Sequence, residues 1–377
     1  MRNYAARIVL VLFSQPHYNF PMLNPELRSG RGAPLNARSQ RFGDPARVAD
    51  GDWLDARSEI DDAAPLRTEV SIETPRTIIS RNTSPDIGFD RSINAYLGCE
   101  HGCIYCFARP THAYLGLSPG LDFESRLTAK PTAAALLRAE LSKRGYVCKP
   151  IALGTNTDPY QPIEATHRIT RGILEVLAEF RHPLTITTKS DRVTRDIDIL
   201  APMAADGLAS VAISVTSLDR TIARTLEPRA PTPTRRLAAM RALSDAGVPV
   251  FVSVSPVVPG ITDHEIEAIL SAAADAGATG AFSLPVRLPH EVAPLFRAWL
   301  DAHFPDRAAK VMSLIQAMRG GRDNDPDYHT RFRGQGAYAE MLRTRFRLAR
   351  DRLGLVNRNL DLRTDLFRVP TPQGSLF

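Results

Sequence analysis

The chain of 377 residues is long enough for one large α/β domain or two smaller ones, and its 44% hydrophobic content allows a sizeable core. Four cysteines, three of them clustered, argue against a disulfide scaffold and favour a reducing compartment, the cytoplasm. The net charge of +6 favours anionic partners only weakly, because 41 acidic residues are interspersed with 47 basic ones.

The first 75 residues are expected to form a poorly ordered extension. Residues 8–13 are apolar, but they are too few to cross a membrane and lack a small-residue cleavage site, so no membrane association is expected. Residues 14–75 are rich in Pro, Gly, Arg and Asp, and such a composition buries too little apolar surface to fold alone. The Arg-Gly run at 28–32 is interpreted either as a nucleic-acid contact or as a solvated tail, and its nearly balanced charge favours the tail.

From residue 76 the pattern changes to short β-branched runs that alternate with helical stretches. Strands separated by helices pair in parallel, so this alternation predicts an α/β fold of six β–α units around one sheet. The expected strands are 92–96, 150–153, 184–188, 208–215, 248–255 and 281–286. The expected helices are 131–144, 168–180, 193–205, 234–246, 263–276 and 291–303.

Residues 304–377 are expected to form a small helical C-terminal element. A helix at 338–353 carries an apolar stripe, and Arg343, Arg347 and Arg350 lie off that stripe. These arginines would either contact phosphates along a nucleic acid or form the solvated face of a helix that covers the open side of the sheet. The solvated face is favoured.

The chemistry is expected to centre on the loop after the first strand, residues 95–107, with the sequence A-Y-L-G-C-E-H-G-C-I-Y-C-F. Its cysteines, Cys99, Cys103 and Cys106, are close enough along the chain to hold one metal centre. Iron–sulfur clusters usually take four cysteine thiolates, but the remaining cysteine, Cys148, is 42 residues beyond Cys106. A cluster held by three cysteines has one iron that is free to bind something else.

The C-x-x-x-C-x-x-C spacing, with an aromatic residue before the last cysteine, resembles the signature of the radical S-adenosylmethionine (SAM) superfamily. The resemblance implies a [4Fe–4S] cluster on the three cysteines, with SAM on the open iron and Tyr105 beside the cofactor. It implies that one electron, from a flavodoxin- or ferredoxin-type reductant, cleaves SAM to methionine and a 5′-deoxyadenosyl radical. The implied fold is a partial (β/α)6 barrel of TIM type over residues 76–303, with its site on loops after the strands.

A non-enzymatic iron–sulfur or zinc-binding protein is the alternative. Zinc knuckles and electron-carrier clusters usually need a fourth Cys or His nearby, and His101 and His112 are the candidates for that ligand. Reductive cleavage of SAM would distinguish the enzyme from this alternative.

Polar residues at the ends of the later strands are the expected SAM contacts. Asp158, in a proline-fixed loop after the second strand, is a candidate acceptor for the SAM ammonium group. Lys189, at the end of the third strand, is a candidate partner of the SAM carboxylate. Strand alternation places Ser214 and Thr216 on one face at the end of the fourth strand, where their hydroxyls would reach the SAM carboxylate or ribose.

Within the superfamily, the order of motifs resembles the spore photoproduct lyase branch, often labelled DNA-repair-photolyase-like. The motifs are residues 98–106, the T-x-D-P loop at 157–159, residues 188–189, residues 214–216 and the Pro-Gly pair at 259–260. Repair or modification of nucleic acid is therefore the leading expectation, and Arg229 is a candidate contact for a substrate phosphate or a partner of Glu227. The lyase uses a cysteine hydrogen donor near the second strand. This chain has none at the expected place, near Thr155, and Cys148 is either a substitute or a buried apolar residue.

Overall fold

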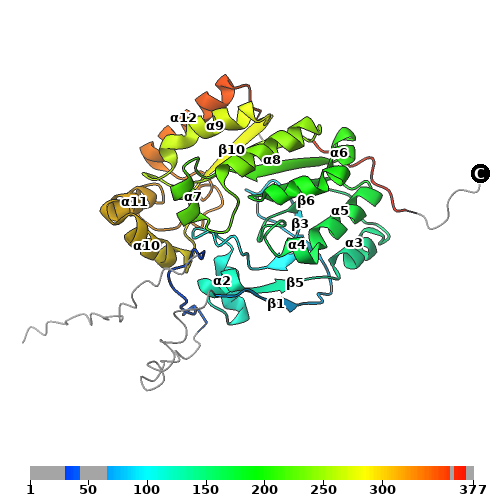
Figure 1. The fold of residues 1–377 in the computed structure, drawn as a ribbon, viewed down its shortest axis with the longest axis horizontal. Coiled ribbons are helices and arrows are strands. Elements are labelled where there is room, and N and C mark those ends of the chain that lie inside the picture. Colours follow the sequence, from blue (N-terminus) through cyan, green and yellow to red (C-terminus); the bar gives the residue numbers. More distant parts are fainter. Residues whose placement is uncertain (1–29, 43–65, 357–360, 371–377) are drawn as a thin grey trace, which may run out of the picture.

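A curved, seven-stranded sheet forms the centre of the computed structural model, which describes residues 30–42, 66–356 and 361–370 (Figure 1). Six strands pair in parallel in the order β3-β6-β7-β8-β9-β10, and β2 pairs antiparallel with β3. Because β10 and β2 are the two edges, the sheet stays open, which confirms the partial barrel. The strands are β2 (Ile79–Arg81), β3 (Arg91–Ile93), β6 (Ile151–Leu153), β7 (Leu184–Thr188), β8 (Ala209–Ser214), β9 (Val250–Val257) and β10 (Gly280–Pro285).

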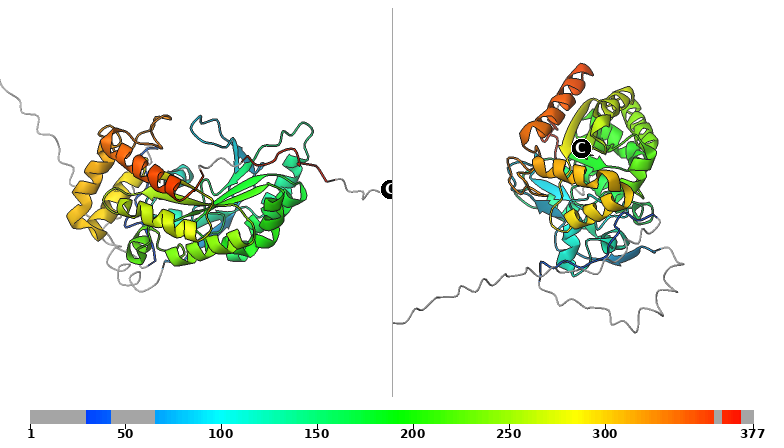
Figure 2. Two further views of the ribbon diagram at one scale, coloured as in Figure 1. Left: turned by 90° about the horizontal axis from the view of Figure 1, so that it is seen from above. Right: turned by 90° about the vertical axis from the view of Figure 1, so that its left-hand side faces the viewer.

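Helices that follow the parallel strands pack along one side of this sheet, as the left view of Figure 2 shows. They are α3 (Ala133–Leu141), α5 (Ile169–Glu179), α6 (Ile197–Ala205), α8 (Pro233–Asp245), α9 (Ile266–Asp275) and α10 (Val292–His303). These confirm the six expected helices. The expected 193–205 helix is split, because its first part is the 3₁₀ turn η3 (Asp191–Asp196).

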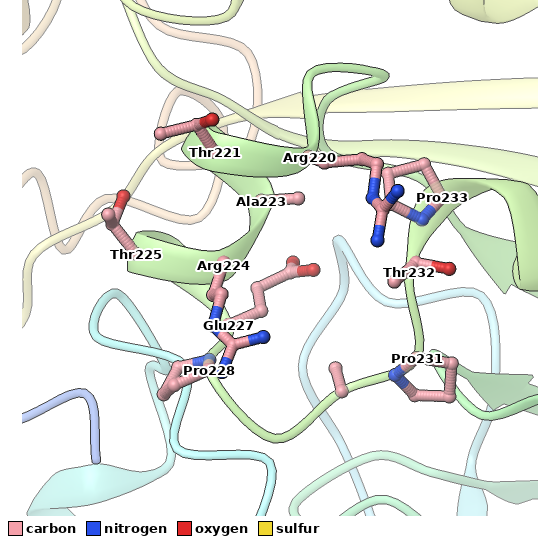
Figure 3. Close-up of a pocket in the computed structure, with 11 residues that line it drawn as sticks. Arg220, Thr221, Ala223, Arg224, Thr225, Glu227, Pro228, Pro231, Thr232 and Pro233 are labelled. Atoms are coloured by element: carbon pink, nitrogen blue, oxygen red, sulfur yellow. The ribbon is translucent and has the colours of Figure 1, made fainter. Parts of the chain in front are cut away.

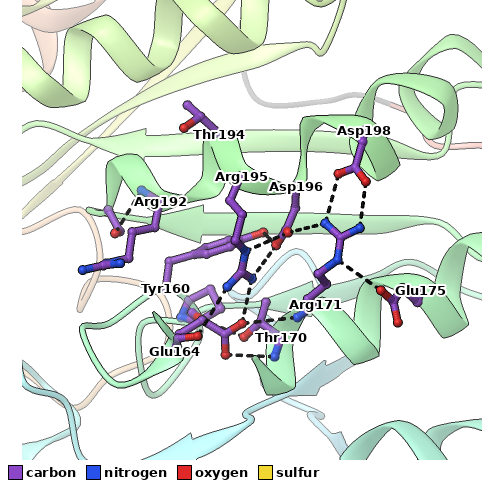
Figure 4. Close-up of polar contacts among 12 residues, drawn as sticks. Tyr160, Glu164, Thr170, Arg171, Glu175, Arg192, Thr194, Arg195, Asp196 and Asp198 are labelled. Atoms are coloured by element: carbon purple, nitrogen blue, oxygen red, sulfur yellow. Dashed lines mark hydrogen bonds and ion pairs between the residues drawn. The ribbon is translucent and has the colours of Figure 1, made fainter. Parts of the chain in front are cut away.

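Short helices were missing from the prediction: α2 (Leu121–Ser125), α4 (Glu164–His167) and α7 (Arg220–Leu226). Figure 4 shows how α4 is joined to the start of α5. The buried Glu164 carboxylate accepts hydrogen bonds from the backbone N–H groups of Thr170 and Arg171, at the start of α5. Arg195 bridges Glu164 and Asp196, so the loops after β6 and β7 are held together.

Part of the N-terminal region belongs to the folded core, so the expectation of poor order is wrong for residues 30–42 and 66–75. Ala33 is buried, and β1 (Glu69–Ile72) pairs in parallel with β5 (Arg126–Ala129). β5 in turn pairs with β4 (Tyr96–Leu97), which completes a second, three-stranded sheet. Order here comes from strand pairing at residues 69–72 and from the packing of Ala33, Leu35 and Leu66 in a buried apolar cluster. Residues 1–29 and 43–65, including the apolar stretch at 8–13, lie outside the described residues.

The C-terminal part adds α11 (Pro305–Ala317) and α12 (Gly336–Arg352). The apolar stripe of α12 packs on α9 and β10 through buried residues such as Leu342, as predicted. Val356, after this helix, forms a parallel β-bridge with Gly280 of β10. Arg343 donates to the carbonyls of residues 333 and 334, and Arg350 pairs with Asp351. The helix therefore covers the edge strand, and two of its three candidate phosphate contacts already have partners. Within the described residues, no helix has both the length and the hydropathy to cross a bilayer.

Candidate active site

The cysteine loop lies beyond the C-terminal end of β3, where sites form in barrels of this kind. Cys99 and Cys103 are buried, and Cys106 is half-buried. The N–H group of Cys99 donates to the Phe123 carbonyl at 2.9 Å. The backbone after Cys103 donates to the Leu226 carbonyl at 3.0 Å. Segments on both sides therefore fix the positions of the thiols.

The loop after β6 holds the cysteine loop through hydrogen bonds to its backbone. Gln161 accepts a hydrogen bond from the Glu100 N–H group at 2.9 Å and donates to the Gly98 carbonyl at 3.2 Å. The Thr157 hydroxyl donates to the same carbonyl at 2.6 Å. The backbone on either side of Cys99 is thus held by two buried side chains, whose role the sequence did not reveal.

A buried ion pair between Arg109 and Glu124 supports the loop from the other side. Arg109 donates to the carbonyls of Gly102 and Cys103, at 3.0 and 2.9 Å. Glu124 accepts from the backbone N–H groups of residues 32 and 33, at 2.9 and 2.8 Å. At Gly32, a Cβ atom would lie 1.9 Å from the Gly102 carbonyl oxygen, so only glycine allows this approach. The N-terminal segment is therefore part of the site.

The chemistry of the three thiols fits an iron–sulfur cluster. Burial, together with the nearby Asp158 and Cys103, raises the pKa of Cys99 well above its usual value. Burial also raises the pKa of Cys103 to about 12, although the Lys189 charge opposes this rise. Without a metal Cys99 and Cys103 are protonated, so cluster binding would release protons from them. Gly98 and Gly102 take positive φ angles of 73° and 67°, which bring the backbone close around the thiols.

Within the described chain, no group of three or more His, Cys, Asp or Glu side chains is arranged to hold a single metal ion. A cubane makes a different demand, because its three cysteines bind three separate irons and their sulfurs need not converge on one point. His101 and His112, the candidate fourth ligands for zinc, have other surroundings. The His101 ring lies 3.4 Å from the Asp158 carboxylate, and the His112 ring bonds the Arg126 carbonyl at 2.9 Å.

Lys189 follows β7 and lies over the ring of Tyr105, with its ammonium 5.7 Å from the ring centroid. Burial would lower the pKa of Lys189, but Cys103 and Glu227 outweigh burial and raise it. Lys189 therefore keeps its charge next to the cysteine loop. This is the geometry that the sequence predicts for a residue that pairs with a cofactor carboxylate, and that role stays a prediction.

Asp158 is committed to other groups of the chain. Its carboxylate accepts hydrogen bonds from the N–H groups of Tyr160 and Lys189 and from the Thr188 hydroxyl, at 2.9, 2.8 and 2.7 Å. Burial alone would raise the pKa of Asp158, but His101 and these donors lower it to about 2. These three hydrogen bonds and the His101 contact join β7 to the cysteine loop through Asp158. Binding of the SAM ammonium group by Asp158 stays a prediction.

Ser214 and Thr216 are both buried at the end of β8. The Thr216 hydroxyl donates to Glu227 at 2.6 Å, so its proton is not free for a cofactor carboxylate, and a contact with the ribose stays a prediction. The Ser214 carbonyl accepts from Arg236 at 3.0 Å. A hydroxyl that the sequence did not single out, that of Ser255 in β9, is buried without a hydrogen-bond partner among the described residues. An orphaned hydroxyl here suits a polar cofactor group.

Glu227 connects the cysteine loop to the outer helices. Its carboxylate accepts from the hydroxyls of Tyr105 and Thr216 and forms a buried ion pair with Arg236 of α8. Of the two alternatives for Arg229, pairing with Glu227 is therefore wrong, because Arg229 pairs with Glu100 at 3.2 Å. The sequence could not decide this, because five arginines lie within nine residues of Glu227.

A pocket of about 330 Å³ borders this site between α7 and the loop that leads into α8. In Figure 3 the Glu227 carboxylate and the Arg220 guanidinium lie in the space between the helix and that loop. The remaining lining residues are Thr221, Ala223, Arg224, Thr225, Pro228, Ala230, Pro231, Thr232 and Pro233.

Cys148 lies at the opposite end of the sheet. It precedes the first residue of β6, whereas the cysteine loop follows the last residue of the parallel strand β3. Burial raises the pKa of the half-buried Cys148 thiol to about 11. Thr155, where the lyase cysteine was expected, bonds Asn94 on the site side at 3.2 Å. Cys148 is therefore placed to act neither as a ligand nor as a hydrogen donor at this site.

Comparison with known proteins gives the family. The sequence profile of the Radical SAM superfamily matches residues 93–273. Uncharacterized proteins of Mycobacterium tuberculosis and Mycobacterium bovis are 37% identical over 265 residues, which cover 70% of this chain and 76% of theirs. The chain belongs to the radical SAM superfamily. It is thus a radical SAM enzyme, and the non-enzymatic alternative is not supported.

The fold of this radical SAM enzyme is also similar to that of spore photoproduct lyase. A single-residue variant of that lyase and its complex with dinucleoside spore photoproduct each superpose with a TM-score of 0.50 at 17% identity. Each superposition covers 77% of this chain and 82% of the lyase chain. A more distant sequence relative, an uncharacterized protein of Methanocaldococcus jannaschii, is 28% identical over 173 residues. These cover 46% of this chain and 62% of the relative.

Proposed function

We propose that this radical SAM enzyme holds a [4Fe–4S] cluster on Cys99, Cys103 and Cys106 and repairs or modifies nucleic acid. The observation that carries the cluster proposal is the placement of three buried or half-buried thiols on one loop that four separate segments brace. When bound, such a cluster supplies the electron that reductively cleaves SAM, and a flavodoxin- or ferredoxin-type donor would recharge it.

The chain's own residues would bind and orient the cofactor. The Lys189 ammonium would pair with the SAM carboxylate, and the orphaned Ser255 hydroxyl would donate to a polar SAM group. Tyr105 holds Lys189 in place through its ring and is itself held by Glu227. Tyr105 and Glu227 are buried, and Lys189 and Ser255 are half-buried, so water has limited access to these groups, which strengthens the charge pairing.

Two features support nucleic acid as the substrate class. The fold is that of a lyase that was solved in complex with dinucleoside spore photoproduct, and the net charge of this chain is +6. The lyase reaction itself does not transfer directly, because the expected cysteine position holds Thr155 and Cys148 is at the wrong end of the sheet. We therefore favour a reaction that uses no hydrogen atom from a thiol of this chain.

The test is an anaerobic assay of the reconstituted enzyme with SAM and dithionite, scored by chromatography for 5′-deoxyadenosine. One arm contains no substrate, and the others contain deuterated single-stranded DNA, double-stranded DNA, RNA or a peptide mixture. The Cys103→Ala variant is the control. We expect 5′-deoxyadenosine that carries deuterium only in a nucleic-acid arm. No 5′-deoxyadenosine in any arm would refute SAM cleavage, and deuterium from the peptides alone would refute the substrate class.

A further inference from the structure

Arg287 is a cationic group at the mouth of the barrel without a carboxylate partner among the described residues. Arg287 follows the last parallel strand by two residues, on the same end of the sheet as the cysteine loop. Among the described residues it has no hydrogen-bond or ion-pair partner, and its Nε atom is buried. Leaving a buried donor unsatisfied is costly, so such a group calls for a ligand.

Arg287 is surrounded by like charges. Its guanidinium carbon lies 4.7 Å from the centroid of the Phe332 ring, and that of Arg331 lies 4.8 Å from the same centroid. Arg319 donates to the carbonyls of Val286 and Arg331, at 2.8 and 2.6 Å. Its guanidinium therefore lies between the backbone next to Arg287 and that of Arg331. Burial and these two arginines lower the pKa of Arg287 to about 10.

Two carboxylates face this group, and both are already engaged. Asp86 accepts both hydrogen bonds from Arg331 at 2.6 Å. Asp325 accepts from the Thr330 hydroxyl at 2.6 Å. Asp86 is thus paired with Arg331, and Asp325 lies 4.0 Å from Arg322, so Arg287 has no carboxylate partner among the described residues.

The Arg331–Asp86 pair also places this group at the open side of the barrel. Asp86 belongs to the loop between β2 and β3, and Arg331 belongs to the segment before α12. The pair therefore joins the two edges of the sheet. In the left view of Figure 2, these segments lie on the side of the sheet that the helices leave free. A long substrate would enter the barrel past this point.

We propose that Arg287, Arg319, Arg331 and Phe332, the arginine cluster, bind a backbone phosphate of a single-stranded nucleic acid, with Arg287 as the free donor. The guanidinium fork matches phosphate oxygens, and the half-exposed ring of Tyr328, 4.6 Å from Arg331, offers a face on which a base can stack. The proposal rests on nucleic acid as the substrate class.

The experiment measures binding of fluorescein-labelled single-stranded DNA and RNA, about 12 nucleotides long, to the full reconstituted chain by anisotropy at several salt concentrations. Variants are Arg287→Gln, Arg287→Lys and Arg241→Gln, the last a matched charge loss at an exposed position of α8. We expect Arg287→Gln to weaken binding about tenfold at low salt and to reduce the log–log salt slope by about 0.7. Arg287→Lys should keep most of the slope, and Arg241→Gln should match the wild type.

The outcomes separate the two proposals. If the wild type binds and Arg287→Gln behaves like Arg241→Gln, the arginine cluster is not a phosphate contact, and nucleic acid remains the substrate class. If the wild type binds neither single-stranded DNA nor RNA at the lowest salt, the arginine-cluster proposal falls, and the deuterium assay alone decides the substrate class. Thermal melting checks for a merely structural role. Arg287 has no hydrogen-bond or ion-pair partner among the described residues and would lose only its contact with the Phe332 ring. Arg287→Gln should therefore melt close to the wild-type temperature, and a large drop would count against the inference.

Discussion

The guanidinium of Arg109 and the carboxylate of Glu124 form a fully buried ion pair that joins the cysteine loop to the N-terminal segment. A buried pair is costly to break, because the partner that remains is an uncompensated charge. An exposed pair is worth little, because water and salt screen it. The chain contains ion pairs of both kinds, which allows a matched comparison.

Glu124→Gln should reduce the free energy of unfolding by about 3–5 kcal/mol. Glu179→Gln, which removes the same charge from the exposed Arg138–Glu179 pair, should cost about 0–1 kcal/mol. Urea denaturation of the cluster-free protein measures both. Equal losses in the two variants would show that the Arg109–Glu124 pair does not support the loop.

Gly32→Ala should lower the melting temperature and the iron content after reconstitution. The new methyl group would meet the Gly102 carbonyl oxygen, which belongs to the cysteine loop itself. Gly88→Ala is the control, because a Cβ atom there has no neighbour within 4 Å. Iron content equal to that of the control would mean that residues 30–42 are not needed to form the site.

Replacing Cys99, Cys103 or Cys106 with Ala should abolish the bound iron and the broad visible absorbance of the reconstituted cluster. Cys148→Ala should keep both, because Cys148 lies beyond the other end of the sheet. Iron and sulfide assays, together with an absorbance spectrum, measure the cluster content of each variant. A full cluster in Cys103→Ala would overturn the ligand assignment.

Lys189→Met should weaken SAM binding about tenfold or more while the iron content stays unchanged, because a charged hydrogen bond to the carboxylate is lost. Lys310→Met, at an exposed position of α11, is the control. Equilibrium dialysis of labelled SAM gives both affinities. Unchanged affinity in Lys189→Met would make Lys189 a purely structural residue.

Glu227 should make stability depend on acid pH. Burial alone would raise the pKa of Glu227, but Arg236, Lys189 and the two hydroxyls lower it from 4.5 to about 2. The ionised group therefore stabilises the fold above pH 4.5, by about 3 kcal/mol, and this contribution disappears as the pH falls towards 2. In urea titrations, the difference in free energy of unfolding between wild type and Glu227→Gln should become smaller as the pH falls over that interval. A gap that is constant with pH would contradict the assignment.

The sequence was enough to predict the sheet and the cysteine loop, because both depend on short-range patterns. Alternating apolar runs indicated six parallel strands, and three closely spaced cysteines indicated one metal centre. The position of Lys189 was predicted from the end of the third strand. In a parallel barrel the loops after the strands meet at one end, so this placed Lys189 beside the cysteine loop.

What supports the site could not be predicted, because the contacts join distant residues. Glu124 reaches back 92 residues to Gly32, and Tyr105 reaches 122 residues ahead to Glu227. Asp158 was assigned to the cofactor because an acidic side chain in a strand-end loop suits a ligand. Its four partners come from three different loops, which no local pattern reveals.

The bracing of the cysteine loop also sets an order of events during synthesis. Arg229, whose N–H group donates to the His101 carbonyl at 3.2 Å, is translated 123 residues after Cys106. At about 5–20 residues per second, the three thiols wait roughly 6–25 s before the last of these braces has been made. During that time they are exposed to oxidants on an unfinished chain. Cluster delivery should therefore follow translation of the β8–α8 region, and the nascent chain would benefit from a partner that shields its thiols until then.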